Sequence, residues 1–229
     1  MKTYKLLSQR FYLFKEVTKE EETITNLIKS NIEMKPSLSI LDIGSNKGTI
    51  AHNLQENAEN ITLVDVEDFT PQTGAKFLRG KWEDLNVQDK FELVLASYVW
   101  GHFYHDGIMN RAFDKALEAT REGGHLVLCF NSDVGFVSKL VNKCKDLFLD
   151  FQYDVFNKSL LKGLNFEEID FKVFVKAKDF EQLIDLIQVL IIVPDEIFEA
   201  KREEVKEYLK SQLSIPEFYI DQKLIIIRK

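Results

Sequence analysis

The sequence has 229 residues, 45% of them hydrophobic, and a formal net charge of −7. This length suits one sizeable domain, and the acidic balance argues against a dedicated nucleic-acid binder. Two cysteines without a metal-type spacing fit neither a disulfide framework nor a metal site. The N-terminus lacks the apolar core of a signal peptide, and the longest apolar stretch, residues 189–193, is too short to span a bilayer. We therefore expect a soluble cytoplasmic protein without a membrane or nucleic-acid partner.

Residues 1–35 carry apolar side chains at helical spacing, and Pro36 ends the pattern. We expect these residues to form a helical cover for a sheet. A sharper alternative is that Arg10, Phe11 or Tyr12 closes over a bound cofactor.

A glycine turn follows the first predicted strand. The largely apolar run at residues 38–43 suits a strand buried on both faces, as in a parallel sheet. Gly44 and Gly48 come next, and residues 49–57 then have helical character. A strand, a glycine turn and a helix in this order are typical of a ligand site at the carboxyl end of a strand.

The spacing of these glycines excludes two common nucleotide motifs. A dinucleotide fingerprint that starts at Gly44 needs glycine at the positions of Asn46 and Thr49, and a phosphate-binding loop also needs glycine at position 49. Asn46 tolerates the left-handed backbone better than most residues do, so a tight turn still fits here.

The second predicted strand, residues 61–64, is followed by Asp65. Asp65 lies 21 positions after Gly44 (65 − 44), and an acidic residue about 20 positions past such a loop bonds the ribose hydroxyls in doubly wound nucleotide sites. A carboxylate suits a diol because it accepts two hydrogen bonds. Glu67 and Asp68 are the rivals for this role.

Further strands are predicted at residues 75–80, 91–95 and 126–130. The alternation of strand and helix predicts a parallel sheet with right-handed crossovers. Ala96 to Tyr98 follow the central strand, near the switch point where doubly wound sheets bind ligands. Trp82 either stacks on a bound ring or packs in the core.

Three stretches together resemble the class I S-adenosylmethionine-dependent methyltransferases. Residues 42–48, Asp-Ile-Gly-Ser-Asn-Lys-Gly, are similar to the first motif of that family, with Asn46 in place of its middle glycine. Residues 91–102 are similar to its fourth motif, commonly Phe-Asp-Leu-Val-x-x-x-x-Val-Leu-x-His, with Glu92 replacing Asp. Residues 122–124, Glu-Gly-Gly, are similar to its Pro-Gly-Gly turn.

The resemblance implies an α/β fold with a doubly wound, mostly parallel seven-stranded sheet, an antiparallel edge hairpin and helices on both faces. Residues 166–175 and 218–227 are expected to form the hairpin, with two amphipathic helical patterns inserted between them. We expect a single domain over residues 1–229, made of a helical cover (1–35), a cofactor-binding core (36–176), a helical lid (177–214) and the last strand (215–229). A packing or dimer surface is the alternative for the lid, and the sequence leaves monomer and dimer open.

The resemblance also implies S-adenosyl-L-methionine as cofactor and S-adenosyl-L-homocysteine as product. The family commonly has an Asp beside the adenine where this chain has Lys81, so we expect Glu83 to accept a hydrogen bond from the adenine amino group instead. The residues expected to bind the cofactor lie in the glycine turn and near the ends of the next three strands: Asp42, Gly44, Ser45, Gly48, Asp65, Val66, Trp82, Glu83, Ala96, Ser97 and Tyr98.

Methyl transfer from a sulfonium mainly requires alignment of the acceptor and exclusion of water, with a base where the acceptor carries a proton. His102 is the expected base and His105 the second candidate, because the intrinsic pKa of histidine suits the task. A structural role is the alternative for His102. The residues expected to contact the acceptor follow the central strand: Tyr98, Trp100, His102, Phe103, Tyr104 and His105.

The chain lacks the sequence marks of adenine, amide-nitrogen and cytosine carbon-5 methylation. We therefore expect a methyltransferase that acts on a small-molecule N, O or S acceptor, without a metal. The alternatives are a protein methyltransferase and a non-catalytic S-adenosylmethionine-binding protein, since Asn46 and Lys81 both depart from the family pattern.

Overall fold

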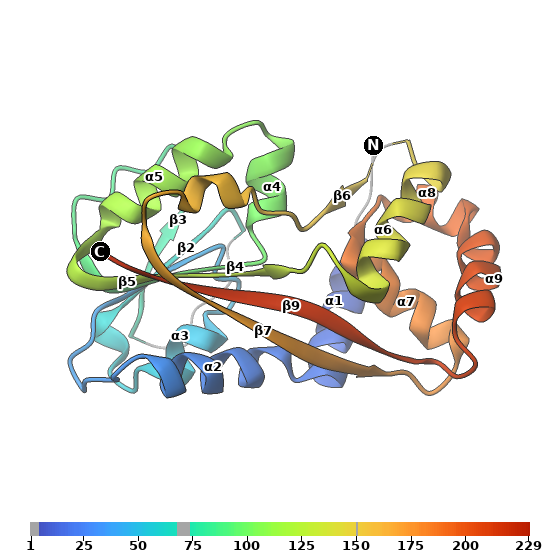
Figure 1. Cartoon of the computed structure of the whole chain (residues 1–229), viewed down its shortest axis with the longest axis horizontal. Helices are drawn as coiled ribbons and strands as arrows, with labels where there is room; N and C mark the ends of the chain where they lie inside the picture. Colours follow the sequence, from blue (N-terminus) through green and yellow to red (C-terminus); the bar gives the residue numbers. More distant parts are fainter. Residues whose placement is uncertain (1–4, 68–73, 150) are drawn as a thin grey trace. The chain divides into compact units, whose positions relative to one another are not determined.

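The computed structural model of the protein describes residues 5–67, 74–149 and 151–229 (Figure 1). Asp68, one of the predicted rivals of Asp65, lies outside these ranges. The helices are α1 (Lys5–Thr18), α2 (Glu20–Asn31), α3 (Thr49–Leu54), α4 (Trp100–His105), α5 (Met109–Ala119), α6 (Gly135–Leu147), α7 (Phe180–Leu190), α8 (Asp195–Ala200) and α9 (Arg202–Gln212), with 3-10 turns η1 (Ala58–Asn60) and η2 (Lys158–Leu161). The strands are β1 (Ile40–Ile43), β2 (Ile61–Asp65), β3 (Lys76–Arg79), β4 (Phe91–Ser97), β5 (Thr120–Asn131), β6 (Gln152–Tyr153), β7 (Asn165–Lys176), β8 (Ile191–Ile192) and β9 (Glu217–Arg228).

Seven strands form one sheet in the order β3-β2-β1-β4-β5-β9-β7, which confirms the predicted doubly wound fold. β1 pairs in parallel with both β2 and β4, and β4 pairs in parallel with β5. Ile43 lies opposite Val64 and Ala96, so the carboxyl ends of three strands meet at one edge. This edge is where doubly wound sheets bind their ligands.

β9 runs antiparallel to its neighbours, as predicted for the end of the chain. The N–H of Gly123, near the start of β5, donates to the carbonyl of Lys229, while the N–H of Ser132, just after β5, donates to the carbonyl of Asp221. On the other side of β9, the N–H of Ala177 donates to the carbonyl of Pro216. β7 and β9 are therefore the arms of a hairpin whose connection contains α7, α8 and α9.

The chain divides into two compact units. Unit 1 is made of the described residues of Met1–Glu20, Asn131–Asp154 and Phe171–Gln222, and unit 2 of those of Glu21–Phe130, Val155–Asp170 and Lys223–Lys229. Each unit has its own cluster of buried apolar side chains. β7 and β9 each contribute residues to both units.

In unit 2, α4 and α5 cover one face of the sheet and α2 and α3 cover the other (Figure 1). Strands covered on both faces have no side exposed to water, so their sequences are almost wholly apolar. All four residues of β1 are buried, and so are the first four of β2.

In unit 1, α7 supplies much of the apolar core, because Leu183, Ile184, Leu186 and Ile187 are fully buried there. Two helical patterns were predicted between the strands of the hairpin. The first is α7, and the second, which starts at Pro194, is in fact two helices, α8 and α9, separated at Lys201. The two-stranded antiparallel sheet of β6 and β8 was not predicted, because strands of two residues carry no periodic signal.

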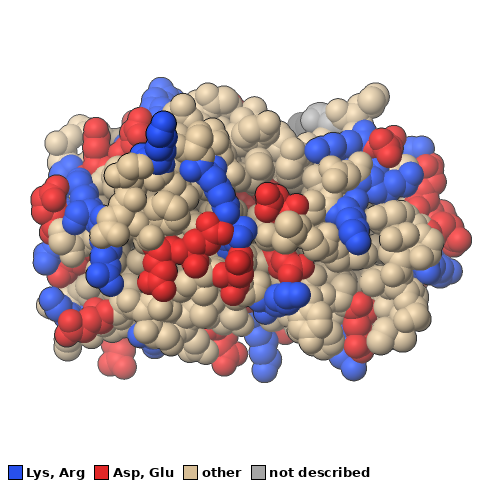
Figure 2. Space-filling model, viewed as in Figure 1, with Lys and Arg blue, Asp and Glu red and all other residues tan. Residues whose placement is uncertain are grey.

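Acidic and basic side chains are interspersed over the face drawn in Figure 2. None of the helices within the described ranges has the length and apolar character needed to cross a membrane.

Candidate active site

The turn after β1 is shaped by two glycines in the left-handed region. Gly44 and Gly48 both have φ of 70°, and a Cβ at Gly48 would lie 2.7 Å from the side chain of Leu63. The N–H groups of Gly44 and Ser45 both donate to the carbonyl of Val64, at 2.9 and 3.0 Å. These main-chain bonds hold the turn against β2. The backbone at position 48 lies so close to the side chain of Leu63 in β2 that the position favours glycine.

Asp65, at the end of β2, is bonded to the glycine turn. Its Oδ2 accepts from the N–H of Asn46 at 2.8 Å, and its Oδ1 accepts from the N–H of Glu67 at 3.1 Å. A carboxylate offers about four acceptor positions, so both oxygens can accept further hydrogen bonds from a diol. Glu67 is exposed and its backbone supports Asp65, which favours Asp65 over Glu67 as the ribose-binding residue.

Two buried polar atoms near this turn have no hydrogen-bond partner among the described residues: Oδ1 of Asn46 and Nε2 of His52. Asn46 has φ of 50°, the left-handed conformation that its sequence position suggested. Burial lowers the pKa of His52, which follows the turn on α3. Buried polar atoms are normally satisfied by protein, water or ligand, so a water molecule or a bound group with suitable polar atoms would meet these two.

Tyr98 follows β4 with an unusual backbone. Its φ is 56°, which is a strained conformation for a residue with a large side chain. The N–H of Tyr98 donates to the carbonyl of Cys129 at 2.9 Å, and the Cys129 thiol donates to the Tyr98 hydroxyl at 3.3 Å. Strained residues of this kind cluster at functional sites because the surrounding structure has to hold them in place.

Three aromatic residues predicted to touch a ligand lie in the core instead. Trp82 is 3% exposed, and its indole N–H donates to the carbonyl of Ala112 at 3.0 Å. Trp100 is fully buried, with its indole N–H donating to the carbonyl of Ala96 at 3.0 Å, and Phe103 packs edge-on against it. We therefore assign Trp82 to core packing and withdraw Trp100 and Phe103 from the predicted acceptor pocket.

The remaining predicted residues are distributed between the sheet edge and α4. Asp42, Ser45 and Ala96 are buried, Ser97 and Glu83 are partly buried, and Val66 is exposed. On α4 the side chains of His102, Tyr104 and His105 are exposed, and the rings of Tyr104 and His105 lie 5.4 Å apart. Lys81, which replaces the family's Asp, forms an ion pair with Asp106 at 3.8 Å.

Arg10 was one of three N-terminal residues considered for closing over a bound cofactor, and its contacts do not favour that role. In unit 1 its guanidinium bonds to Asp185 at 2.7 Å and to Glu199 at 2.8 Å, and also to Gln188. Arg10 therefore ties α1 to α7 and α8 rather than presenting a free cation. Sequence reasoning missed Cys129 as the residue that holds Tyr98, since neither the spacing nor the residue type indicates that contact.

Comparison with known proteins gives one family. The profile of a methyltransferase domain matches residues 9–171, which is more than half of the chain. A search of curated protein sequences found no match.

Solved structures with the same fold include a proposed methyltransferase from Bacillus halodurans C-125 (17% identity, 90% of this chain and 98% of that chain, TM-score 0.65). They also include the N-methyltransferase NodS from Bradyrhizobium japonicum WM9 with S-adenosyl-L-homocysteine (13% identity, 94% of this chain and 87% of that chain, TM-score 0.53). A third is the magnesium protoporphyrin IX methyltransferase from Synechocystis PCC 6803 with the same ligand (11% identity, 97% of this chain and 87% of that chain, TM-score 0.55).

Proposed function

Because the chain belongs to this methyltransferase domain family, we propose that it transfers a methyl group from S-adenosylmethionine to a small-molecule N, O or S acceptor. The observation that carries the proposal is the hydrogen bond between the carboxylate of Asp65 and the N–H of Asn46. It joins a diol-binding acid to a glycine turn at the carboxyl edge of a parallel sheet, where such folds bind nucleoside ligands.

The residues of this edge fit S-adenosylmethionine. At Gly44 and Gly48 an added Cβ would meet Val99 and Leu63, so glycine at both positions lets the turn pack closely against the strand ends that would line the site. The unpartnered Oδ1 of Asn46 is available to a donor. Asp65 would hold the ribose hydroxyls, and the backbone after β4, including Ser97 and Tyr98, would line the same site.

When bound, the cofactor supplies a methyl group that is activated by the positive charge of its sulfonium. The residues of the chain would align the acceptor and exclude water around that methyl group. His102 is our proposed base for an acceptor that has a proton to lose. His102→Gln is then expected to lower turnover and leave affinity for S-adenosylhomocysteine unchanged.

A small acceptor is supported by one structural neighbour, which is named for magnesium protoporphyrin IX. A nitrogen acceptor is supported by NodS, which is named as an N-methyltransferase. The non-catalytic alternative is separated from an enzyme by turnover. A protein that only binds the cofactor would not generate S-adenosylhomocysteine from S-adenosylmethionine with any acceptor.

The lid role of residues 177–214 stays a prediction. α7 and α8 bury Leu183, Ile187 and Phe198 in the core of unit 1, so deleting the segment would remove that core. Point substitutions on the exposed side of α9 are the better test, with turnover and cofactor affinity measured separately.

The proposal is tested by titration calorimetry with S-adenosylhomocysteine and with NAD, of which only the first should bind. Asp65→Ala should weaken the affinity about ten- to a hundredfold, because hydrogen bonds to charged groups contribute about 1.5–3 kcal/mol. Glu67→Ala is the matched control and should change the affinity much less, since Glu67 offers Asp65 only its backbone N–H. Binding of NAD without S-adenosylhomocysteine would overturn the proposal.

A further inference from the structure

The loop that follows β3 begins beside Asp65. β3 pairs in parallel with β2, and Arg79, the last residue of β3, lies opposite Asp65. The N–H of Gly80 then donates to the carbonyl of Asp65 at 2.9 Å. Residues 80–85, which we call the base loop, therefore leave the sheet at the same carboxyl edge as the acid that we expect to hold a ribose. A base attached to that ribose would lie next to this loop.

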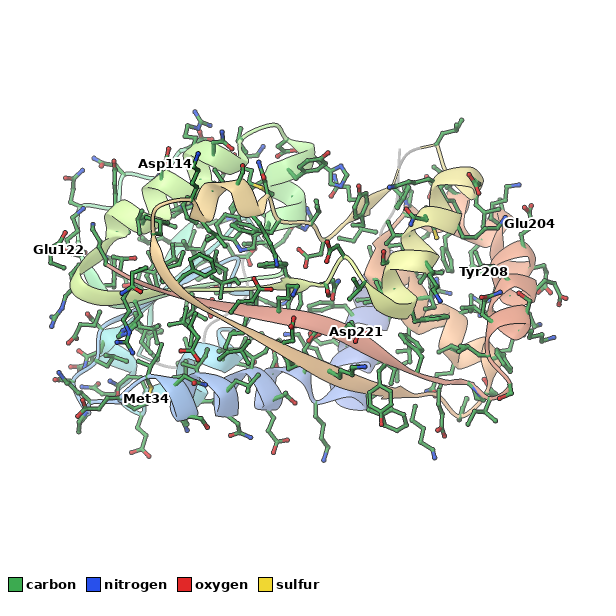
Figure 3. All side chains as sticks on the ribbon, in the orientation of Figure 1. Met34, Asp114, Glu122, Glu204, Tyr208 and Asp221 are labelled. Carbon is green, nitrogen blue, oxygen red and sulfur yellow. The ribbon has the colours of Figure 1, made fainter. Side chains whose placement is uncertain are left out.

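One lysine of α5 holds the base loop at two points. Lys115 is partly buried and follows the exposed Asp114, which is labelled on α5 in Figure 3. Its ammonium group donates to the carbonyl of Trp82 at 2.5 Å and also to the carbonyl of Leu85. The same ammonium group lies 4.6 Å from the centre of the Trp82 ring, within the range of a cation–π interaction. The contacts of this one side chain thus fix the loop both at Trp82 and at Leu85.

Trp82 attaches the loop to the same helix by a second bond. Its indole N–H donates to the carbonyl of Ala112, three residues before Lys115, at 3.0 Å. Burial lowers the pKa of Lys115, while the nearby carboxylates of Asp84 and Glu83 act in the opposite direction. Lys115 is therefore a cation that is partly withdrawn from water and bonded to main-chain carbonyls, rather than a mobile surface charge.

Glu83 lies between the two carbonyl groups that Lys115 bonds. Trp82 directly precedes it, and Leu85 comes two positions later. Its side chain is partly buried, and within the described ranges no residue forms a hydrogen bond or an ion pair with its carboxylate. The position of Glu83 is thus set by the backbone on either side of it. A carboxylate only accepts hydrogen bonds, so it suits a base with an amino group, such as adenine.

From these contacts we infer that Lys115 is a positioning residue for recognition of the cofactor's base. It holds the base loop so that Glu83 accepts a hydrogen bond from the amino group of adenine. The inference rests on the proposed methyltransferase function and concerns the selectivity of that site for adenine. The alternative is that Lys115 only stabilises the loop, in which case the selectivity does not depend on it.

The test compares two ligands of the full chain. S-adenosylhomocysteine is titrated first by calorimetry, so a failure of the proposed function is seen as the absence of any binding. The second ligand is its analogue with purine in place of adenine, which lacks the amino group. S-adenosylhomocysteine should bind about ten- to a hundredfold more tightly, because the analogue makes no hydrogen bond to the charged acceptor. Equal affinities for the two ligands would overturn the inference without any variant.

The ratio of these two affinities is then measured in variants. Lys115→Met removes the ammonium group and keeps an unbranched side chain, and it should bring the ratio close to one. Lys115→Arg keeps a cation with several N–H donors and should preserve most of the ratio. Glu83→Ala should also bring the ratio close to one. Adding Lys115→Met to Glu83→Ala should then change the ratio no further, since the lysine acts through Glu83.

Lys90→Met is the matched control. Lys90 also donates to a main-chain carbonyl of α5, that of Glu118 at 2.7 Å, and its loss should leave the ratio unchanged. If Lys115→Met does not fold or binds neither ligand, Trp82→Phe is the second variant, because it removes the bond to Ala112 and should lower the ratio as well. An unchanged ratio in a folded variant of either kind would overturn the inference and show that these contacts only stabilise the loop.

Discussion

The glycine turn of unit 2 and the helices of unit 1 are each stabilised from within by different kinds of groups. At the carboxyl edge in unit 2, the turn is shaped by main-chain hydrogen bonds from Gly44 and Ser45 and by backbone in the left-handed region. In unit 1, ion pairs between charged side chains join the helices. Arg10 and Arg202 both bond to Asp185 and to Glu199.

This difference predicts different sensitivity to substitution. A turn made by backbone depends on space and on φ, so a single added methyl group disrupts it, whereas many changes of side-chain type are tolerated. A network of side chains tolerates changes of size better than the loss of a hydrogen-bonding atom. The following substitutions test this contrast.

The largest effect is expected for Gly48→Ala. The left-handed backbone costs a residue with a Cβ about 1–2 kcal/mol, and a Cβ only 2.7 Å from Leu63 adds overpacking of about 1–3 kcal/mol. The free energy of unfolding, measured by urea denaturation, should therefore fall by about 2–5 kcal/mol. S-adenosylhomocysteine affinity should fall with it.

Gly107→Ala separates the two contributions. Gly107 has nearly the same φ, 71°, but an added Cβ would meet nothing within 4 Å. Only the cost of the backbone, about 1–2 kcal/mol, should remain. Equal losses in the two variants would show that Leu63 gives way at no cost and that close packing does not require glycine at position 48.

A smaller effect is expected for Asp195→Ala in unit 1. Asp195 is 6% exposed, and its carboxylate accepts from the N–H groups of Leu6 and Leu7 at 2.9 and 3.2 Å and from Gln188 at 3.1 Å. Its loss should lower the free energy of unfolding by about 1–3 kcal/mol and speed amide hydrogen exchange in α1.

Asp195→Asn keeps one acceptor oxygen and should recover part of the loss. Asp179→Ala, which removes an exposed cap of α7, should cost about 1 kcal/mol without loosening α1. Unchanged exchange in α1 after Asp195→Ala would mean that apolar packing alone holds this helix.

The smallest effect concerns an ion pair of unit 2. Hydrogen bonds from Lys158 and Lys223 lower the pKa of Glu168 below its usual value of 4.5. The stability gained from the ionised Glu168 is therefore fully present above about pH 4.5, the unfolded value, and is lost as the pH falls through the lower folded pKa. Lys223→Met should reduce the stability at neutral pH by less than about 1 kcal/mol and flatten its decline in acid.

The difference is measured by recording the midpoint of unfolding at a series of acidic pH values, for the original protein and for the Lys223→Met variant. Lys172→Met, at an ion pair with Asp221 whose lysine is more exposed, is the control for the loss of a surface lysine. A steeper decline in the Lys223→Met protein would contradict the assigned sign.

The sequence was most informative where burial on two faces or a fixed spacing leaves a direct trace. β1, β2 and β4 were predicted because doubly covered strands are apolar along their length. Asp65 was predicted by its distance from Gly44, and the structure bonds it to the glycine turn. Its role toward a ligand stays a prediction.

The sequence was least informative where contacts between residues far apart in the chain determine the position of a side chain. Trp100 and Phe103 were expected at a ligand, but they are one helical turn apart on α4 and pack into the core together, leaving Tyr104 and His105 exposed. Glu20 and Gln222 are bonded across a separation of 202 positions, which no local pattern encodes.

The order in which the strands are synthesised has a consequence for how the protein is made in a cell. β9 is synthesised after both β5 and β7 but lies between them in the sheet. Until it is inserted, β7 has no neighbour in that sheet, and its 12 residues carry unpaired backbone groups that can pair with another chain.

Neither unit is complete before this step, since unit 1 needs residues up to Gln222 and unit 2 needs Lys223–Lys229. The final contacts join residues far apart in sequence, which slows folding and lengthens the time during which an unfinished edge is exposed. Loss of part of β9 would thus leave a newly made chain prone to aggregate, because β7 would keep an unpaired edge.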